Sequence, residues 1–169
     1  MGLLALATAA FAVTDTATSS FQTNVNAMAV VDISGTAANL TLVAPSTGGA
    51  AISAVSDATT YAQYTSVIST AKTRSLDAKI SSGTVPAGTA LKLTAGTPTG
   101  TGTLGTAGSQ ITLSGTVQDI ITAIGSCNTG TGGTAGSNLS YELSVTAVGS
   151  LVTTAANSVT ITFTLNEEA

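Results

Sequence analysis

Few side chains in this chain are of the types that carry out acid–base, nucleophilic or metal chemistry. The sequence has no histidine, which excludes His-based triads and imidazole metal ligands. Three of its acidic residues, Asp77, Asp119 and Glu142, fall within predicted strands. Paired carboxylates that cleave glycosides need a cleft and usually aromatic sugar platforms, yet the sequence has no tryptophan, three tyrosines and three phenylalanines. We therefore interpret these three acids as solvated residues of strand faces or turns.

The remaining reactive groups also point away from an enzyme. Cys127 is the single cysteine, so there is no intrachain disulfide and no cysteine metal cage. A buried, inert thiol is the usual state of such a residue, and a cross-link between subunits is the alternative. The Gly/Thr-rich loops lack the Gly-Lys-Ser/Thr of a phosphate-binding loop, and the acidic residues lack the spacing of a calcium-binding loop. The sequence predicts no enzymatic activity, no cofactor and no metal.

The charge balance restricts the partners. The net charge is −4, and charged residues make up 7% of the 169 positions, where about 25% is usual. All four cations, Lys72, Arg74, Lys79 and Lys92, fall in one short stretch. Such a chain would be repelled by nucleic acid. A neutral, threonine-rich surface lacks the charge that keeps monomers apart and suits a subunit that assembles.

Runs of alternating and β-branched residues, separated by Gly, Ser, Pro and Asn, predict short β-strands joined by turns. These strands must position the side chains considered above. Helical periodicity is nearly absent, although residues 149–157 suit a brief helical turn. We predict strands at residues 21–33, 39–44, 62–70, 75–82, 89–96, 110–114, 116–124, 138–148 and 158–166. This pattern predicts an all-β protein with a single antiparallel β-sandwich, Ig-like or jelly-roll-like. We assign residues 1–20 to an apolar N-terminal segment and residues 21–169 to the sandwich domain.

Two strands show the alternation clearly. In residues 75–82, Leu76, Ala78 and Ile80 point one way, while Asp77 and Lys79 point the other. The closing strand at residues 158–166 is the cleanest in the chain, with threonines on one face. Its apolar face carries Val159, Ile161, Phe163 and Leu165.

Residues 1–13 carry no charge and almost no polarity, and two hypotheses explain them. They have the apolar run and the small-residue end, at Ala10-Phe11-Ala12, of a secretory signal, although the positive n-region is missing. They are too short for a membrane span, which needs about 20 apolar residues. An apolar strand retained for insertion into a groove is the second hypothesis. Both favour an exported, extracellular protein.

Residues 9–35 resemble the start of mature camelysin/TasA-type biofilm fibre proteins. The matching positions are Phe11, the turn Asp15-Thr16-Ala17-Thr18-Ser19, and Phe21, which opens an alternating strand. The strands after residue 115 are similar to the closing strands of secreted β-sandwich proteins. The resemblance implies an extracellular fibre in which each subunit's N-terminal strand completes the sandwich of the next. The N-terminus here is richer in Leu and Ala than a typical donor strand.

Our hypothesis is a structural subunit of an extracellular filament or pilus, a homopolymer that assembles head-to-tail without a membrane span. The donor residues would be Leu4, Leu6, Phe11 and Val13, and the acceptor groove or core would include Val159, Ile161, Phe163 and Leu165.

The alternative hypothesis is a secreted adhesin or carbohydrate-binding module that contacts glycans or cell surfaces. Its stacking platforms would be Tyr61, Tyr64 or Tyr141. Two Asn-X-Ser/Thr sequons, at Asn39 and Asn138, are candidate glycosylation sites. They matter only if the organism glycosylates its exported proteins, and both asparagines equally suit ordinary polar positions in strands.

Overall fold

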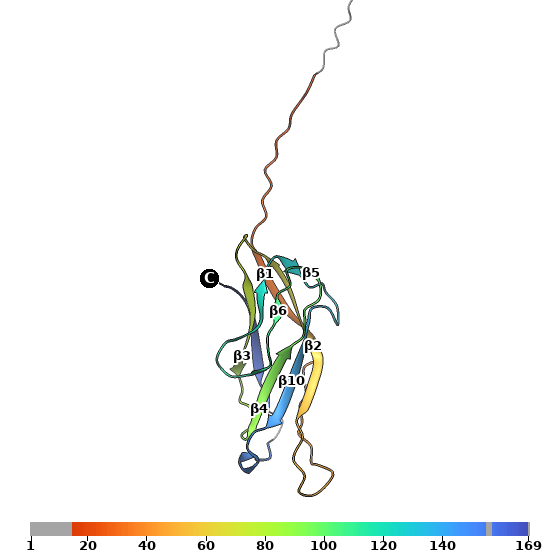
Figure 1. Cartoon of the computed structure of the whole chain (residues 1–169), viewed down its shortest axis with the longest axis vertical. Coiled ribbons are helices and arrows are strands. Elements are labelled where there is room, and N and C mark those ends of the chain that lie inside the picture. Colours follow the sequence, from red (N-terminus) through yellow and green to blue (C-terminus); the bar gives the residue numbers. More distant parts are fainter. Residues whose placement is uncertain (1–14, 155–156, 169) are drawn as a thin grey trace, which may run out of the picture.

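The computed structural model describes residues 15–154 and 157–168 and shows two antiparallel β-sheets packed face to face (Figure 1). This confirms the prediction of an all-β sandwich. In the described residues the only helical element is the 3-10 turn η1 (Val148–Ser150), in line with the helical turn expected there. No helix in these ranges is long and apolar enough to cross a membrane.

The two sheets differ in size. The seven-stranded sheet has the order β5-β9-β2-β10-β4-β7 and also contains β1. β9 and β10 pair with different stretches of one edge of β2, and β1 pairs with the opposite edge. The four-stranded sheet has the order β11-β3-β8-β6. The strands are β1 (Met28–Gly35), β2 (Val55–Val67), β3 (Arg74–Ser82), β4 (Thr89–Ala95), β5 (Thr101–Gly102), β6 (Thr106–Ala107), β7 (Ile111–Thr112), β8 (Gln118–Ile124), β9 (Cys127–Asn128), β10 (Ser137–Val145) and β11 (Thr160–Glu167).

The core lies between the inner faces of the two sheets. Leu93 and Leu139 from the larger sheet and Leu76 and Ile121 from the smaller one have no exposed surface. In β10, alternate residues are buried from Ser137 to Leu143, as the period of two predicts. The inward positions predicted for β3 are confirmed, because Leu76 and Ala78 are buried and Ile80 packs against the core.

A β-bulge explains the double isoleucine of β8. Leu76 pairs with Ile121 while Asp77 pairs with Asp119, so Ile120 is an extra residue in β8. Both Ile120 and Ile121 are buried as a result. Consecutive apolar residues give this run a partly helical pattern, but the β-branched side chains and the bulge keep it a strand.

Two predicted strands are wrong in whole or part. Residues 21–27 form no strand, and Phe21 and Val25 are 84% and 80% exposed, so the half-buried face expected there is absent. Pairing with β2 begins only at Met28. Residues 39–44 alternate as a strand would, but they have no strand partner and belong to the long connection between β1 and β2. Alternation predicts an extended backbone, whereas a strand also needs a neighbour.

Candidate functional site: a groove beside the last strand

β11 is an edge strand whose inner face is only partly covered. It pairs with β3 on one side, and no described strand pairs with its other side. Its inward residues Ile161, Phe163 and Leu165 are half-buried, while the fully buried core lies farther inside, on strands such as β3 and β8. An eight-residue edge without proline or lysine, in unbroken register with β3 from Ile161 to Glu167, is an exposed template for pairing with another strand.

An apolar groove of about 1040 Å³ opens between β11 and the larger sheet. Val159, Ile161 and Phe163 form one wall, and Leu91 and Leu143, from β4 and β10, lie on the other sheet. The remaining lining is aliphatic or threonine-rich for the most part and includes Ile33, residues 37–44, Ile52, Thr60, Val85, Pro86, Tyr141 and residues 151–154. Among the described residues, none that lines the groove carries a charged side chain.

The groove begins where β1 leaves the sheet. β1 pairs with β2 from the pair Met28 and Val67 to the pair Gly35 and Thr60. Before Thr60, no described strand pairs with β2 on that side. Gly35 has φ +102°, and a Cβ there would lie 2.2 Å from the Thr59 carbonyl oxygen. Only glycine therefore lets the chain turn away at this point. The connection that follows, residues 36–54, runs beside the groove and lines it through residues 37–44.

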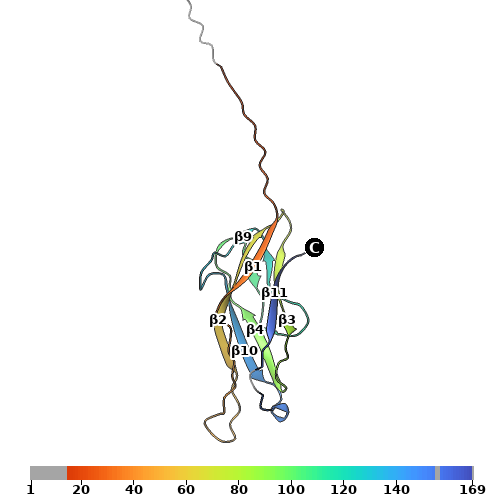
Figure 2. The ribbon, with the colours of Figure 1, turned by 180° about the vertical axis from the view of Figure 1, so that it is seen from behind.

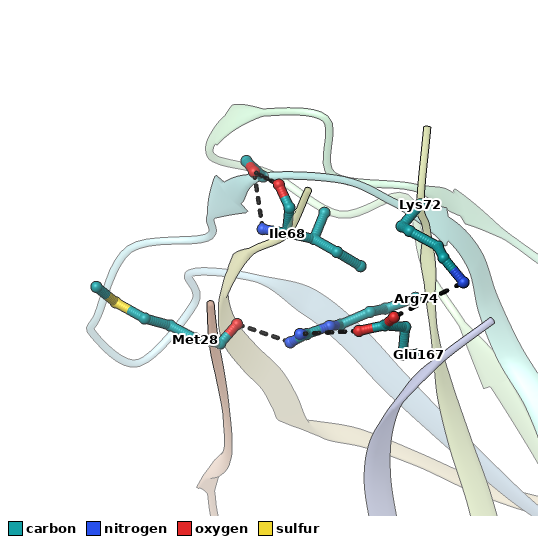
Figure 3. A network of polar contacts seen from close by, with 6 residues as sticks. Met28, Ile68, Lys72, Arg74 and Glu167 are labelled. Carbon is teal, nitrogen blue, oxygen red and sulfur yellow. Dashed lines mark hydrogen bonds and ion pairs between the residues drawn. The ribbon is translucent and has the colours of Figure 1, made fainter. Parts of the chain in front are cut away.

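The other half of this side of the sandwich is closed. There β1 contacts β11, and the buried side chain of Arg74 links them: its Nη1 donates to the Met28 carbonyl at 2.7 Å. Its Nη2 lies 3.7 Å from Glu167, which Lys72 also approaches at 3.9 Å. Figure 3 shows this cluster. Nearby, the backbone N–H of Ile68 donates a hydrogen bond to the side-chain hydroxyl of Ser126. β1 and β11 are therefore tied together at this end.

Residues 15–27, the projecting segment, leave the body from the closed end. Figures 1 and 2 show this segment running away from the sandwich beyond the start of β1. All thirteen of its residues are exposed, and Asp15 is its only charged residue. Fully extended, a segment of this length spans roughly 40 Å. The groove lies toward the opposite end, where the connection between β1 and β2 forms the long loop of Figure 1.

The predicted acceptor residues lie on β11, except for Val159, which directly precedes that strand. Val159, Ile161 and Phe163 line the groove, whereas Leu165 packs against the core closer to the Arg74 cluster. The predicted donor residues lie outside the described residues: these are Leu4, Leu6, Phe11 and Val13.

The residues of the adhesin hypothesis are placed less favourably. Tyr64 is 3% and Tyr141 6% exposed, so neither offers a free ring for stacking, and only Tyr61 is half-buried. Burial raises the pKa of both buried tyrosines, and the Tyr64 hydroxyl donates to the Leu104 carbonyl. Two of the three aromatic platforms are therefore inside the protein.

The sequons and the cysteine occupy different environments. Asn39 is exposed in the connection that lines the groove. The Asn138 side-chain amide donates to the carbonyl oxygens of Ala58 and Thr60, so this nitrogen is already engaged within the sheet. Cys127 is buried on β9, and burial raises the pKa of its thiol. An inert thiol is the consequence.

The three acidic residues considered for chemistry do not all come together: Asp77 and Asp119 are register partners on β3 and β8 of the smaller sheet, whereas Glu142 lies on β10 of the larger sheet. Glu142 on β10 forms an ion pair with Lys92 on β4 at 2.8 Å, and this contact holds the pKa of Glu142 below its usual range. Asp119 is exposed. The prediction that Asp77 is solvated is wrong, because Asp77 is 4% exposed, covered in the middle strand of its sheet. No group of three or more His, Cys, Asp or Glu side chains in the described ranges is placed to hold a metal.

Sequence reasoning missed most of the groove. Its floor comes from Leu91 and Leu143, which lie on predicted strands but were not among the predicted groove residues, and its rim comes from residues 37–44. The available signal was the long run between Gly35 and Val55, since connections of this length in a compact domain usually have a function. Comparison with known protein families, curated proteins and solved structures finds no match to this chain.

Proposed function

We propose that this protein is a structural subunit of an extracellular filament or pilus, in which each copy donates its apolar N-terminal segment to the groove of the next. The observation that carries the proposal is the uncharged groove beside the unpaired edge of β11. It lies toward the end of the sandwich opposite to the one from which the projecting segment leaves.

An extended strand suits both features of the groove. Its backbone would pair with the free N–H and C=O groups of β11, and alternate side chains would enter the apolar space. The stretch from Val159 to Phe163 corresponds to roughly 13 Å of strand. Each Leu, Phe or Val that becomes fully buried there would contribute about 1.5–3 kcal/mol. Several such residues together would make detachment rare.

The positions of segment and groove favour a neighbour as the acceptor. In one molecule the projecting segment leads away from the groove, whereas a second copy placed ahead of it presents its own groove toward the segment. The contact is heterologous, because the surface that donates differs from the surface that accepts. Repetition of such a contact without closure gives an open filament.

Export is the part of the proposal that comes from the sequence. The uncharged residues 1–13 precede a chain in which 7% of residues are charged and threonines cover the outer faces of strands such as β11. A surface with so little charge favours association. The resemblance of residues 9–35 to secreted fibre subunits points the same way.

The experiment compares three chains by negative-stain electron microscopy: the full chain, a variant lacking residues 1–13 and a variant lacking residues 1–20. We expect filaments from the full chain and dispersed subunits from the variant lacking residues 1–20. N-terminal sequencing of filaments sheared from cells identifies the segment that is retained. Filaments from the variant lacking residues 1–13, but not from the variant lacking residues 1–20, would move the donor to residues 14–20. Filaments from all three chains would contradict donation by residues 1–20.

A further inference from the structure

Two aspartates face each other on the outer face of the smaller sheet. Asp77 on β3 and Asp119 on β8 are register partners, directly opposite across the two strands. Like charges in such positions destabilise a sheet. The bulge at Ile120 places Asp119 there, because without the extra residue the alternation of β8 would shift by one position. Bulges commonly re-aim a side chain at functional sites.

The Asp77 carboxylate is held in place with one oxygen free. Asp77 is 4% exposed, and its Oδ2 accepts a hydrogen bond from the side-chain amide of Asn166 on β11. Its Oδ1 is buried and accepts no hydrogen bond from an N–H or O–H group of the described residues. A buried carboxylate oxygen without a partner is costly. Such an oxygen, on a residue whose register partner carries a second carboxylate, is the feature expected where an ion binds.

No ion pair of the described residues joins a cation to Asp77 or Asp119. Lys72 and Arg74 pair with Glu167, and Lys92 pairs with Glu142. Lys79 lies two residues beyond Asp77 on the same strand, and the ion pairs of the described residues do not include it. The Asp77 carboxylate raises the pKa of Asp119, because only a protonated Asp119 can donate a hydrogen bond to it; burial and the negative charges of Asp77 and Glu168 act in the same direction.

We propose that Asp77 and Asp119 bind a divalent cation of the oxygen-preferring class, best matched by Ca²⁺, which joins β3 to β8 through the two carboxylates. Asn166 supplies a third oxygen once its exposed side-chain amide rotates, so that β11 is joined to the same ion. Water completes the coordination, because Ca²⁺ takes six to eight oxygen ligands in flexible geometry. Two carboxylates and one amide make a weak site, with a Kd of about 10⁻⁴–10⁻³ M, the range of extracellular calcium modules.

The proposal is independent of strand donation, and it is tested on the full-length chain after removal of metals with EDTA. Calorimetry records Tm with and without about 5 mM CaCl₂, against NaCl of matched ionic strength. We expect CaCl₂ to raise Tm by about 2–5 °C, and titration calorimetry to show one binding site. MgCl₂ should have a smaller effect, since Mg²⁺ demands a stricter geometry and keeps its water.

Asp119→Asn is the decisive variant, because Asp119 is exposed and the change preserves its shape. We expect this variant to lose the calcium response and to be at least as stable as the wild type in EDTA, where repulsion is removed. Asp32→Asn, at an exposed aspartate of β1, is the matched control and should keep the full response.

Two results would overturn the proposal. If CaCl₂ leaves the wild-type Tm unchanged and titration shows no binding, the two carboxyl groups share only a proton. If the calcium response persists in Asp119→Asn, the cation binds elsewhere on the protein.

Discussion

The side of the sandwich where β1 and β11 meet has two halves with opposite character. In one half, β1 covers the edge of β2 and Arg74 ties β1 to β11. In the other half β1 has left the sheet, and the same two sheets stand apart around an uncharged groove. Both halves use alternating strands with apolar inner faces. The difference is the presence of a covering strand, which the chain supplies to the first half and which we propose a neighbour supplies to the second.

The largest expected effect comes from placing a charge in the open half. Phe163→Asp puts a carboxylate on the groove wall, where a donated strand would bury it without a partner. We expect complete loss of filaments in electron micrographs, with a folded monomer by circular dichroism because Phe163 is only half-buried now. Thr162→Asp, on the outer face of the same strand, is the matched control and should still polymerise. Loss of filaments in both variants would show that β11 is merely intolerant of charge.

The boundary between the halves is tested at Gly35. Gly35→Ala introduces a Cβ against the Thr59 carbonyl at a φ of +102°. We expect a loss of about 1–3 kcal/mol in the free energy of unfolding from backbone strain, measured by urea denaturation. Gly48→Ala, where a Cβ meets nothing within 4 Å, is the control and should change stability little. Equal stability of wild type and Gly35→Ala would mean that β1 leaves the sheet for another reason.

The closed half is tested at Arg74. Arg74→Met keeps an unbranched apolar stem but removes the hydrogen bond to the Met28 carbonyl and the ion pair with Glu167. We expect the free energy of unfolding, measured by urea denaturation, to fall by about 1–2 kcal/mol. Amide hydrogen exchange should accelerate most at the start of β1. Lys72→Met removes an exposed contact to the same glutamate and should cost less than about 1 kcal/mol. Equal losses of stability in Arg74→Met and Lys72→Met would indicate that Arg74 stabilises the protein through Glu167 and not through the Met28 carbonyl.

The smallest effect concerns the ion pair behind the groove floor. Because Lys92 holds the pKa of Glu142 below its usual value of 4.5, the pair stabilises the protein above that pH. This stability is lost as pH falls through the lowered pKa. Stability curves of wild type and Lys92→Met should therefore differ at neutral pH and converge in acid. A difference that is the same at every pH would assign the effect to packing of the lysine stem.

The sandwich itself was predictable from the sequence, because a period of two specifies which face of each strand is buried. Leu76 and Ala78 in β3 and the threonine face of β11 lie as the alternation predicts. The same signal failed for residues 21–27 and 39–44, which alternate equally well but have no strand beside them. Alternation records what a segment can bury and contains no information on which partner is present.

The candidate site was predictable only in part. The apolar face of β11 was visible in the sequence, while the groove depends on where β1 leaves β2, which follows from the backbone conformation of Gly35. The Asp77–Asp119 pair was hidden because a bulge sets its register. Pairing of residues from distant strands is a tertiary property that composition and spacing do not specify.

A cryo-EM reconstruction of the filament tests the central claim most directly. We predict an extended strand in the groove along Val159–Phe163, hydrogen-bonded to β11 and continuous with the N-terminal segment of the neighbouring subunit. A groove that stays empty, or that is filled by residues of the same subunit, would contradict the account.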